Sequence, residues 1–211
     1  WVAIICAITS FGAIIADKFL IDLIESFFSS SNIGLCLTFA VLAAAIYYAG
    51  LKRRQKRPEK IFSNEAIIFL GVLLTAASVG YLGKALDTGS GHFSILFLLS
   101  TFIYAGLALW FPSKLVWLFS LISLGSWFGT ETGYISGWGA YFLGMNYPLR
   151  FILFGSFLVA ASFLLKNNSK LSDFHKPTYI MGLLYLFISL WILSIFGNYG
   201  DMHSWYDVKQ Y

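Results

Sequence analysis

Two ionisable residues near the ends of neighbouring apolar segments, Glu131 and Arg150, are the clearest candidates for chemistry in this sequence. A carboxylate at the boundary of the hydrocarbon needs a partner or water, and it can bind a cation or a proton. Three interpretations of Glu131 follow: a ligand in a vestibule at the outer membrane surface, a structural partner of Arg150, or a solvated acid at the interface.

Three further residues on the same side could join a ligand or ion site, namely His92, Asp201 and His203. With Asp207 they offer the imidazole and carboxylate groups that hold metal ions in proteins. Their spacing matches no metal motif, and polar residues at a membrane interface are the simpler explanation. We therefore predict no metal site and no cofactor.

Motifs of known enzymes are absent from the sequence. It contains no H-E-x-x-H, no G-x-S-x-G, no P-loop and no C-x-x-C. No charged residue or histidine falls at the predicted middle of a span, where proton-coupled carriers commonly place one. We therefore predict no catalytic residues, and the sequence argues against a proton pump.

Four glycines at a strict spacing of four lie in the stretch that contains Glu131. Successive members of such a series advance by only about 40° around a helix, so they form a nearly continuous groove. In lipid, a groove of this kind lets two helix backbones approach closely. We expect a helix-packing face, with the partner helix in the same chain or in a neighbouring subunit, formed by Gly125, Gly129, Gly133 and Gly137.

The composition requires these residues to lie in membrane helices. Of the 211 residues, 58% are hydrophobic and only 11% are charged, whereas soluble domains carry about 25% charged residues. Apolar runs long enough for spanning helices recur, where the strands of a barrel would alternate. The predicted fold class is an all-α polytopic bundle in a single transmembrane domain. Its net charge of +4 does not indicate a nucleic-acid partner.

Seven transmembrane helices are predicted. The first is shorter than the roughly 20 residues that a span needs, which indicates that its start is missing. Residues 17–28 follow it with charged side chains on one stripe and apolar ones around the rest, as in an amphipathic helix at the membrane interface. The spans cover residues 1–16, 33–51, 65–83, 93–111, 115–138, 149–166 and 178–197.

A basic run in the loop 52–64 orients the predicted bundle. An excess of Lys and Arg marks the cytoplasmic side of a membrane protein. Together with the segments 112–114 and 166–177, this loop holds ten of the fourteen basic residues. The prediction places these segments in the cytoplasm and the C-terminus outside. Such a cluster could also bind anionic lipid head groups; its first members are Lys52, Arg53, Arg54, Lys56 and Arg57.

Three stretches of the chain resemble a known family. They are FLGVLLTAASVGYLGKALD at 69–87, WFGTETGYISGWGAYFLGMNYPLRF at 127–151 and LYLFISLWILSIFGNYGD at 184–201. Together with the spacing of the spans, they are similar to an uncharacterised family of bacterial predicted membrane proteins, one of the domain-of-unknown-function families, over residues 65–201. The resemblance implies a bacterial inner-membrane location, and it transfers no catalytic or binding residue.

Two functions are predicted from these observations. The first is a structural or accessory subunit that packs through the glycine groove into a homo-oligomer or a larger membrane complex. The second is a transporter or channel for a small solute or ion, entered from an acidic outer vestibule around Glu131, Arg150 and Asp201. An enzyme is a distant third. The lipid bilayer of the inner (plasma) membrane is the expected partner in each case.

Overall fold

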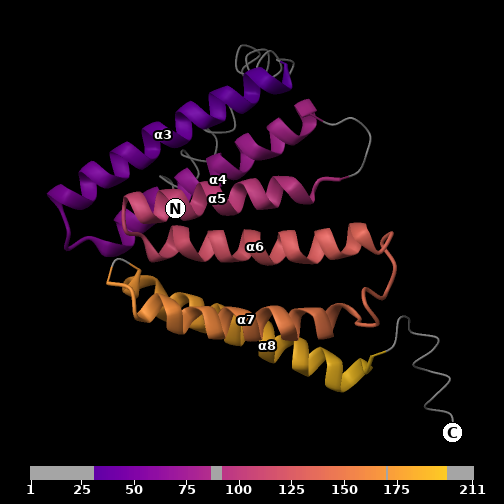
Figure 1. The fold of residues 1–211 in the computed structure, drawn as a ribbon. Helices are drawn as coiled ribbons and strands as arrows, with labels where there is room; N and C mark the ends of the chain where they lie inside the picture. Colours follow the sequence, from indigo (N-terminus) through magenta and orange to yellow (C-terminus); the bar gives the residue numbers. More distant parts are fainter. Residues whose placement is uncertain (1–30, 87–91, 170, 199–211) are drawn as a thin grey trace, which may run out of the picture.

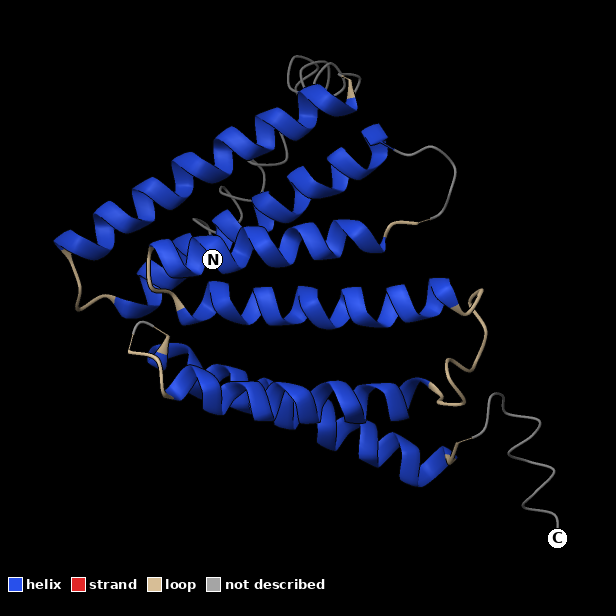
Figure 2. Ribbon diagram, viewed as in Figure 1, coloured by secondary structure: helices blue, strands red, loops and turns tan. Residues whose placement is uncertain are grey.

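The computed structural model describes residues 31–86, 92–169 and 171–198, and in these ranges it contains helices and no β-strand (Figures 1 and 2). The predicted all-α fold class is therefore confirmed. The predicted span 1–16 and the amphipathic helix 17–28 lie outside the described residues. The elements are α3 (Asn32–Lys56), α4 (Ile61–Leu86), α5 (Ser94–Trp110), α6 (Lys114–Ile135), α7 (Tyr147–Lys166), the 3-10 helix η1 (Ser172–Phe174) and α8 (His175–Phe196).

Polar side chains cap the first turns of several helices. The Ser31 hydroxyl accepts a hydrogen bond of 3.1 Å from the backbone N–H of Gly34 at the start of α3. The Asn146 side chain does the same for Leu149 at the start of α7, where Pro148 occupies the first turn without the loss of a needed N–H. Such caps satisfy donors that have no carbonyl partner inside the helix. They fix the helix starts at the polar residues between the apolar runs.

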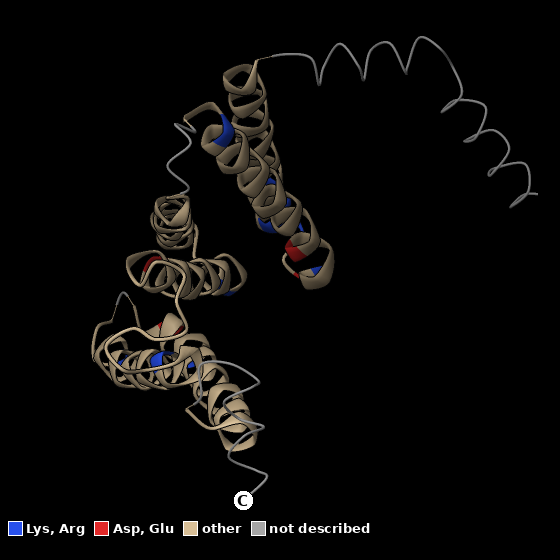
Figure 3. Cartoon of the chain, turned by 90° about the vertical axis from the view of Figure 1, so that its right-hand side faces the viewer, with Lys and Arg blue, Asp and Glu red and all other residues tan. Residues whose placement is uncertain are grey.

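The helices pair in chain order into three antiparallel hairpins, α3/α4, α5/α6 and α7/α8 (Figure 1). Each helix makes most of its contacts with its hairpin partner. The α5/α6 hairpin lies between the other two, and we call it the central hairpin. The α3/α4 hairpin leans away from it (Figures 1 and 3).

The turns between the helices gather at two opposite ends of the bundle (Figure 1). One end holds the turns after α3, α5 and α7, and we call it the basic end. The other holds the end of α6 and the loop 136–146, and we call it the Glu131 end. Of the described basic residues, the Glu131 end has only Lys84 and Arg150. The basic end has Lys52, Arg53, Arg54, Lys56, Arg57, Lys60, Lys114, Lys166 and Lys176.

Four helices are long and apolar enough to cross a membrane: α3, α4, α7, and α8 taken together with η1. Helix α5 is apolar but has 17 residues, so it is about 25 Å long, shorter than a hydrocarbon core of about 30 Å. Helix α6 is longer, but glycine, serine and threonine dilute its second half. The predicted number of seven spans is therefore not confirmed, although each of the six predicted spans between residues 33 and 197 coincides with a helix.

Large apolar side chains cover the outer faces of the two flanking hairpins. Val41 and Tyr48 on α3 are each 68% exposed, and Phe187 and Trp191 on α8 are 61% and 66% exposed. A water-soluble monomer rarely exposes so continuous an apolar surface, whereas in a bilayer these side chains face lipid. Both flanks of the bundle are therefore suited to contact with the membrane.

The core is divided between the two sides of the central hairpin. Toward α3/α4, Ile68 and Tyr104 are buried in one apolar cluster. Toward α7/α8, the rings of Phe128 and Phe154 stack with their centroids 4.9 Å apart, and the rings of Phe154 and Tyr185 meet edge to face with their centroids 5.2 Å apart. These ring pairs join α6 to both helices of the α7/α8 hairpin.

Two glycines bring the backbones of α7 and α8 into contact. A Cβ added to Gly155 would lie 2.7 Å from the carbonyl oxygen of Gly182, and a Cβ added to Gly182 would lie 3.0 Å from the carbonyl oxygen of Gly155. Backbone atoms cannot move aside as a flexible side chain can, so neither position accepts a larger residue. Close approach of this kind favours helix association in lipid through van der Waals packing.

Candidate functional site

Three polar side chains converge at the Glu131 end of the central hairpin. Glu131 lies one turn before the end of α6, and His92 and Ser94 lie at the start of the antiparallel α5. Oε2 of Glu131 is 2.9 Å from Nε2 of His92, and it also accepts a short hydrogen bond from the Ser94 hydroxyl. The His92 ring stacks on Tyr134, with the ring centroids 4.0 Å apart. We call these four residues the Glu131 cluster.

The Glu131 cluster is only partly shielded from its surroundings. The Glu131 side chain is 24% exposed and that of His92 is 36% exposed, whereas Ser94 is buried. Both contacts use Oε2, and no described residue donates a hydrogen bond to Oε1. The carboxylate therefore offers one oxygen to a cation, a proton or a polar solute.

This arrangement suits binding better than covalent chemistry. In a nucleophilic triad the hydroxyl donates to the imidazole, and an acid orients the imidazole from its other side. Here the Ser94 hydroxyl donates to the carboxylate, so the imidazole of His92 is not placed to activate it. The cluster is a carboxylate positioned by two neighbours, which is a group that binds cations or exchanges protons.

Arg150 is buried at the same end, where the loop after α6 holds it. Its Nε donates to the carbonyl oxygen of Met145 at 3.0 Å, and its Nη2 donates to that of Ala140 at 3.1 Å. Its Nη1 lies 3.4 Å from the Thr132 hydroxyl, and the guanidinium lies over the Tyr147 ring, 4.4 Å from its centroid. Arg150 therefore anchors the loop that connects α6 to α7.

The predicted pair between Glu131 and Arg150 does not form among these contacts. Glu131 is two residues from Gly129 and so points about 200° away from it around the helix. Since Gly129 faces the α7/α8 hairpin, Glu131 turns toward α5 and away from α7, which carries Arg150. Of the predicted ligand residues, the structure brings together Glu131 and His92 and keeps Arg150 apart. The other two, Asp201 and His203, lie outside the described residues.

Three of the four spaced glycines make room for rings of the same chain. A Cβ added to Gly129 would lie 2.9 Å from Cζ of Phe151 on α7. The other two glycines are likewise covered by tyrosine side chains of α7 and α8, so the groove predicted from the spacing is filled within the bundle. The pairs are Gly125 with Tyr185, Gly129 with Phe151, and Gly133 with Tyr147.

Gly137 does not line this groove, because α6 ends before it. The helix stops at Ile135, and Gly137 has φ +63°, a left-handed conformation that glycine adopts without steric cost. The N–H of Trp138 bonds to the carbonyl of Gly133 at 2.7 Å, and the N–H of Gly137 bonds to that of Tyr134 at 2.9 Å. These two bonds form the Schellman motif that closes many helices. Gly137 is therefore the residue that terminates α6.

A cavity of about 260 Å³ lies between α4, α5 and α6. Its lining includes Phe93, the residue between His92 and Ser94 in the sequence, but no member of the Glu131 cluster. Most of the wall is apolar, with three hydroxyl groups further along α5 and on α6. These hydroxyls belong to Ser100, Tyr104 and Ser123.

The five residues predicted to set topology or bind lipid lie together at the basic end. Arg53 donates to the Ser63 hydroxyl at 2.9 Å, and Arg54 donates to the carbonyl oxygen of Pro112 at 2.9 Å. The second bond ties α3 to the turn of the central hairpin. All five side chains are exposed at the end of α3 or directly after it: Lys52, Arg53, Arg54, Lys56 and Arg57.

Sequence reasoning misses two members of the Glu131 cluster. Tyr134 follows Glu131 by three residues, a spacing that makes two side chains neighbours on a helix surface, so this position could have been found. Ser94 lies near the start of a predicted span, where serine is common and no pattern distinguishes it. Its role depends on the pairing of α5 with α6, which only the structure shows.

Comparison with known proteins adds no function to this geometry. The chain matches no family model, no curated protein and no solved structure. Within the described ranges, no group of three or more His, Cys, Asp or Glu residues is placed to hold a metal ion. The arguments for a function therefore rest on the Glu131 cluster, the cavity lined by Phe93 and the arrangement of the hairpins.

Proposed function

We propose that the protein is a multi-pass membrane protein that provides a passive pathway for a small cation, entered at the Glu131 cluster. One observation carries this proposal: a partly exposed carboxylate is positioned by His92 and Ser94, and the residue between those two, Phe93, lines a cavity whose wall also contains serine and tyrosine residues. Ionisable side chains are costly within membrane helices, and those that are retained commonly mark an ion or substrate path.

The proposed pathway is passive because the described helices carry no Asp, Glu, Lys, Arg or His near their middles. Carriers that couple transport to protons usually place a titratable group there. The central hairpin also contains the short α5, and short or interrupted helices between long ones often form the solute path of a transporter. A cation that leaves Glu131 would next meet the hydroxyl groups of the cavity.

The proposal includes an orientation, with the basic end in the cytoplasm and the Glu131 end outside the plasma membrane. It is supported by the excess of Lys and Arg at the basic end of the described structure, because such an excess favours the cytoplasmic side. The proposal also retains seven spans, of which the first covers residues 1–16. In this orientation a cation from outside reaches Glu131 first.

The role as a structural or accessory subunit has less support in this geometry. The groove that suggested it is filled by rings of Phe151, Tyr147 and Tyr185, so a partner helix would need a different face. The two functions are distinguished by native mass spectrometry on protein extracted gently from its own membrane. A stoichiometric protein partner would favour the subunit role over the pathway.

Flux measurements on reconstituted protein test the pathway. Proteoliposomes are given an outward or inward gradient of Na⁺, K⁺ or H⁺, and flux is followed with an entrapped indicator dye. We expect Glu131→Gln to lower cation flux at least about tenfold, because charged groups at an entrance raise the local concentration of counter-ions by this order. The amide retains an oxygen for Ser94 and His92, so the local fold is preserved.

The matched control is Glu59→Gln, which removes the same charge from an exposed position at the basic end, and it should leave flux unchanged. The pathway is contradicted if the wild-type protein carries none of the three cations faster than protein-free liposomes. It is also contradicted if Glu131→Gln conducts as well as the wild-type protein.

A further inference from the structure

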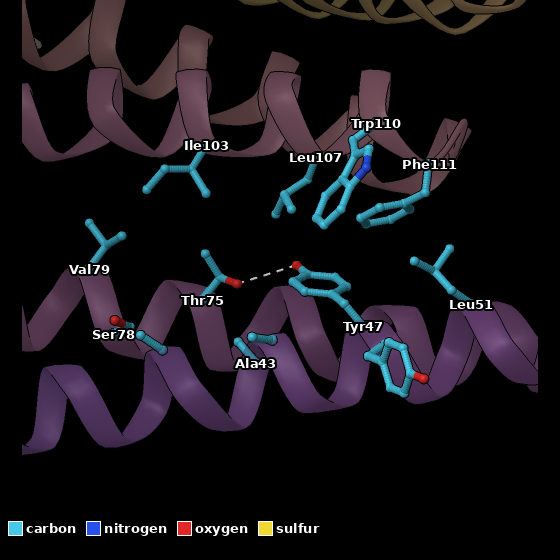
Figure 4. Close-up of a pocket in the computed structure, with 13 residues that line it drawn as sticks. Ala43, Tyr47, Leu51, Thr75, Ser78, Val79, Ile103, Leu107, Trp110 and Phe111 are labelled. Carbon is cyan, nitrogen blue, oxygen red and sulfur yellow. Dashed lines mark hydrogen bonds between the residues drawn. The ribbon is translucent and has the colours of Figure 1, made fainter.

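An apolar cleft of about 370 Å³ opens between α3, α4 and α5, where the α3/α4 hairpin leans away from the central hairpin (Figure 4). In Figure 4, Ala43, Tyr47 and Val79 of the α3/α4 hairpin face Ile103 and Leu107 of α5 across this cleft. Its wall is almost entirely apolar. The cleft is therefore suited to hydrocarbon and not to a polar solute.

Alanines on α3 make room for the cleft. Ala40, Ala43 and Ala44 line it on adjacent turns, where larger residues would reach toward α5. Ala40 and Ala44 remain exposed although they line the cleft, so the cleft opens to the surroundings of the bundle. A slender apolar molecule in the membrane can therefore enter it from the side.

The cleft has the depth of one membrane leaflet. From Ala40 to Leu51, α3 rises by about 16 Å, and half of the hydrocarbon core is about 15 Å. Leu51 lies at the basic end of α3. The cleft therefore extends from the basic end to about the middle of the bilayer.

A second hollow, of about 580 Å³, continues from the cleft at the basic end. The two share Leu51, Trp110 and Phe111, and the second is also lined by Arg54 and Gln55. One continuous depression therefore passes from an apolar wall to a guanidinium and an amide. This is the order of surfaces that a phospholipid presents from its acyl chain to its head group.

Basic and aromatic side chains surround this mouth. Arg54 uses one N–H for the Pro112 carbonyl, and its other N–H donors are available to an anion. Lys52 lines neither hollow; its ammonium lies 5.9 Å from the ring centroid of Tyr48, which lines the cleft. Trp110 is 78% exposed at the mouth, as is typical of indole rings at the head-group level of a membrane.

We propose that this depression binds one anionic phospholipid, with an acyl chain between the α3/α4 hairpin and α5 and the phosphate at Arg54. A guanidinium matches the oxygens of a phosphate group. A transmembrane helix is a poor occupant by comparison, because it is about 10 Å wide and would extend through both leaflets.

The residues chosen to test this site are separate from those of the proposed cation pathway. The head-group end of the site lies at the opposite end of the bundle from the Glu131 cluster, and Arg54 and Ala44 line neither that cluster nor the cavity of the pathway, although the cleft and that cavity share Val79. Loss of lipid binding and loss of cation flux can therefore be observed separately. Failure of one proposal leaves the other standing.

Native mass spectrometry in detergent tests the head-group contact. The protein is titrated with phosphatidylglycerol and, separately, with phosphatidylcholine that carries the same acyl chains. We expect one phosphatidylglycerol molecule to bind more tightly than phosphatidylcholine. Arg54→Gln should raise the dissociation constant for phosphatidylglycerol about fivefold, the effect of one basic residue near an anionic lipid. Arg57→Gln is the matched control, because Arg57 is exposed at the same end and lines neither hollow.

A second pair of variants tests the acyl-chain contact. Ala44→Leu fills the cleft and should weaken the binding of both lipids, whereas Ala45→Leu adds the same atoms at the next exposed position, which does not line the cleft. Both positions are exposed, so both variants should fold, and circular dichroism with thermal melting verifies this.

Four results would overturn the proposal. Equal weakening by Arg57→Gln and Arg54→Gln would indicate diffuse attraction to a charged surface in place of a site. Equal affinity for the two lipids would show that the site does not recognise the head group. Unchanged binding in Ala44→Leu would show that the acyl chain does not occupy the cleft. A dimer that Ala44→Leu dissociates would show that a second copy of the chain occupies the cleft.

Discussion

Arg150 is a buried charge that no described acid neutralises. Carbonyl oxygens of Met145 and Ala140 accept from its guanidinium, and the Tyr147 ring lies against its face. Carbonyl dipoles and an aromatic face can replace much of the water that a guanidinium loses on burial. Arg150 therefore holds the loop between α6 and α7 in place.

Replacement of Arg150 by lysine tests this role. Arg150→Lys should lower the free energy of unfolding by about 2 to 3 kcal/mol, because an ammonium cannot reach both carbonyl oxygens and also cover the ring. Denaturation in detergent, followed by tryptophan fluorescence, measures the loss, and limited proteolysis of the loop 136–146 reports it locally. Lys166→Arg at an exposed position is the control. A variant with wild-type stability and an equally resistant loop would exclude the anchoring role.

The sequence predicts which candidate residues share an end of the bundle, but not which of them touch. His92, Glu131 and Arg150 lie at one end because the apolar runs set the turns between them. Their partners depend on the rotation of α6, which the packing of Gly129 against Phe151 determines. Once that face turns to α7 and α8, Glu131 meets α5. The spacing of residues in the sequence gives the angle between Glu131 and the glycines around the axis of α6. It does not show which helix Glu131 contacts.

At the scale of the helices, two glycines bring the backbones of α7 and α8 into contact. The glycines responsible, Gly155 and Gly182, are single residues far apart in sequence, so no repeat reveals them. The evenly spaced glycines of α6 do indicate a packing face. However, α6 ends at Ile135 and not at residue 138, where the predicted span ended. Apolar runs locate the helices well because lipid solvation depends on composition, whereas helix contacts depend on shape.

Alanine at the α7/α8 contact gives a sharp test of this association. Gly155→Ala and Gly182→Ala should each lower stability by about 1 to 3 kcal/mol, because the added Cβ meets backbone atoms that have no room to move. Thermal melting in detergent measures the effect. Gly106→Ala on α5 is the matched control, since a Cβ there meets nothing within 4 Å, and it should be neutral or slightly stabilising. Equal melting temperatures for all three variants would contradict the contact.

The end of α6 provides another test at this scale. Gly137→Ala should destabilise the protein by about 1 to 2 kcal/mol, because an alanine pays a steric cost in the left-handed conformation. Gly137→Asn should cost less, since asparagine also occurs at this position of a Schellman motif. The melting temperatures of the two variants test this order of stability. If alanine is tolerated better than asparagine, the left-handed turn is not present in solution.

For the whole molecule, the gathering of turns at two ends makes the orientation testable. Leu143 at the Glu131 end is 81% exposed, and Lys166 is exposed at the basic end. On a background without native cysteines, Leu143→Cys should react with an impermeant maleimide in intact cells. Lys166→Cys should react only after the membrane is opened, because basic ends remain in the cytoplasm. The reverse pattern of labelling would invert the proposed orientation.

The pairing of helices in chain order has a consequence for biogenesis. Each helix finds its main partner directly before or after it in the sequence, so no hairpin has to wait for a distant segment of the nascent chain. The described part of the chain can leave the insertion machinery two helices at a time. The polar turn of each hairpin is then placed on its side of the membrane in a single step. Docking of the finished hairpins against each other then becomes the late step of assembly, and contacts that are local in sequence favour rapid folding of each unit.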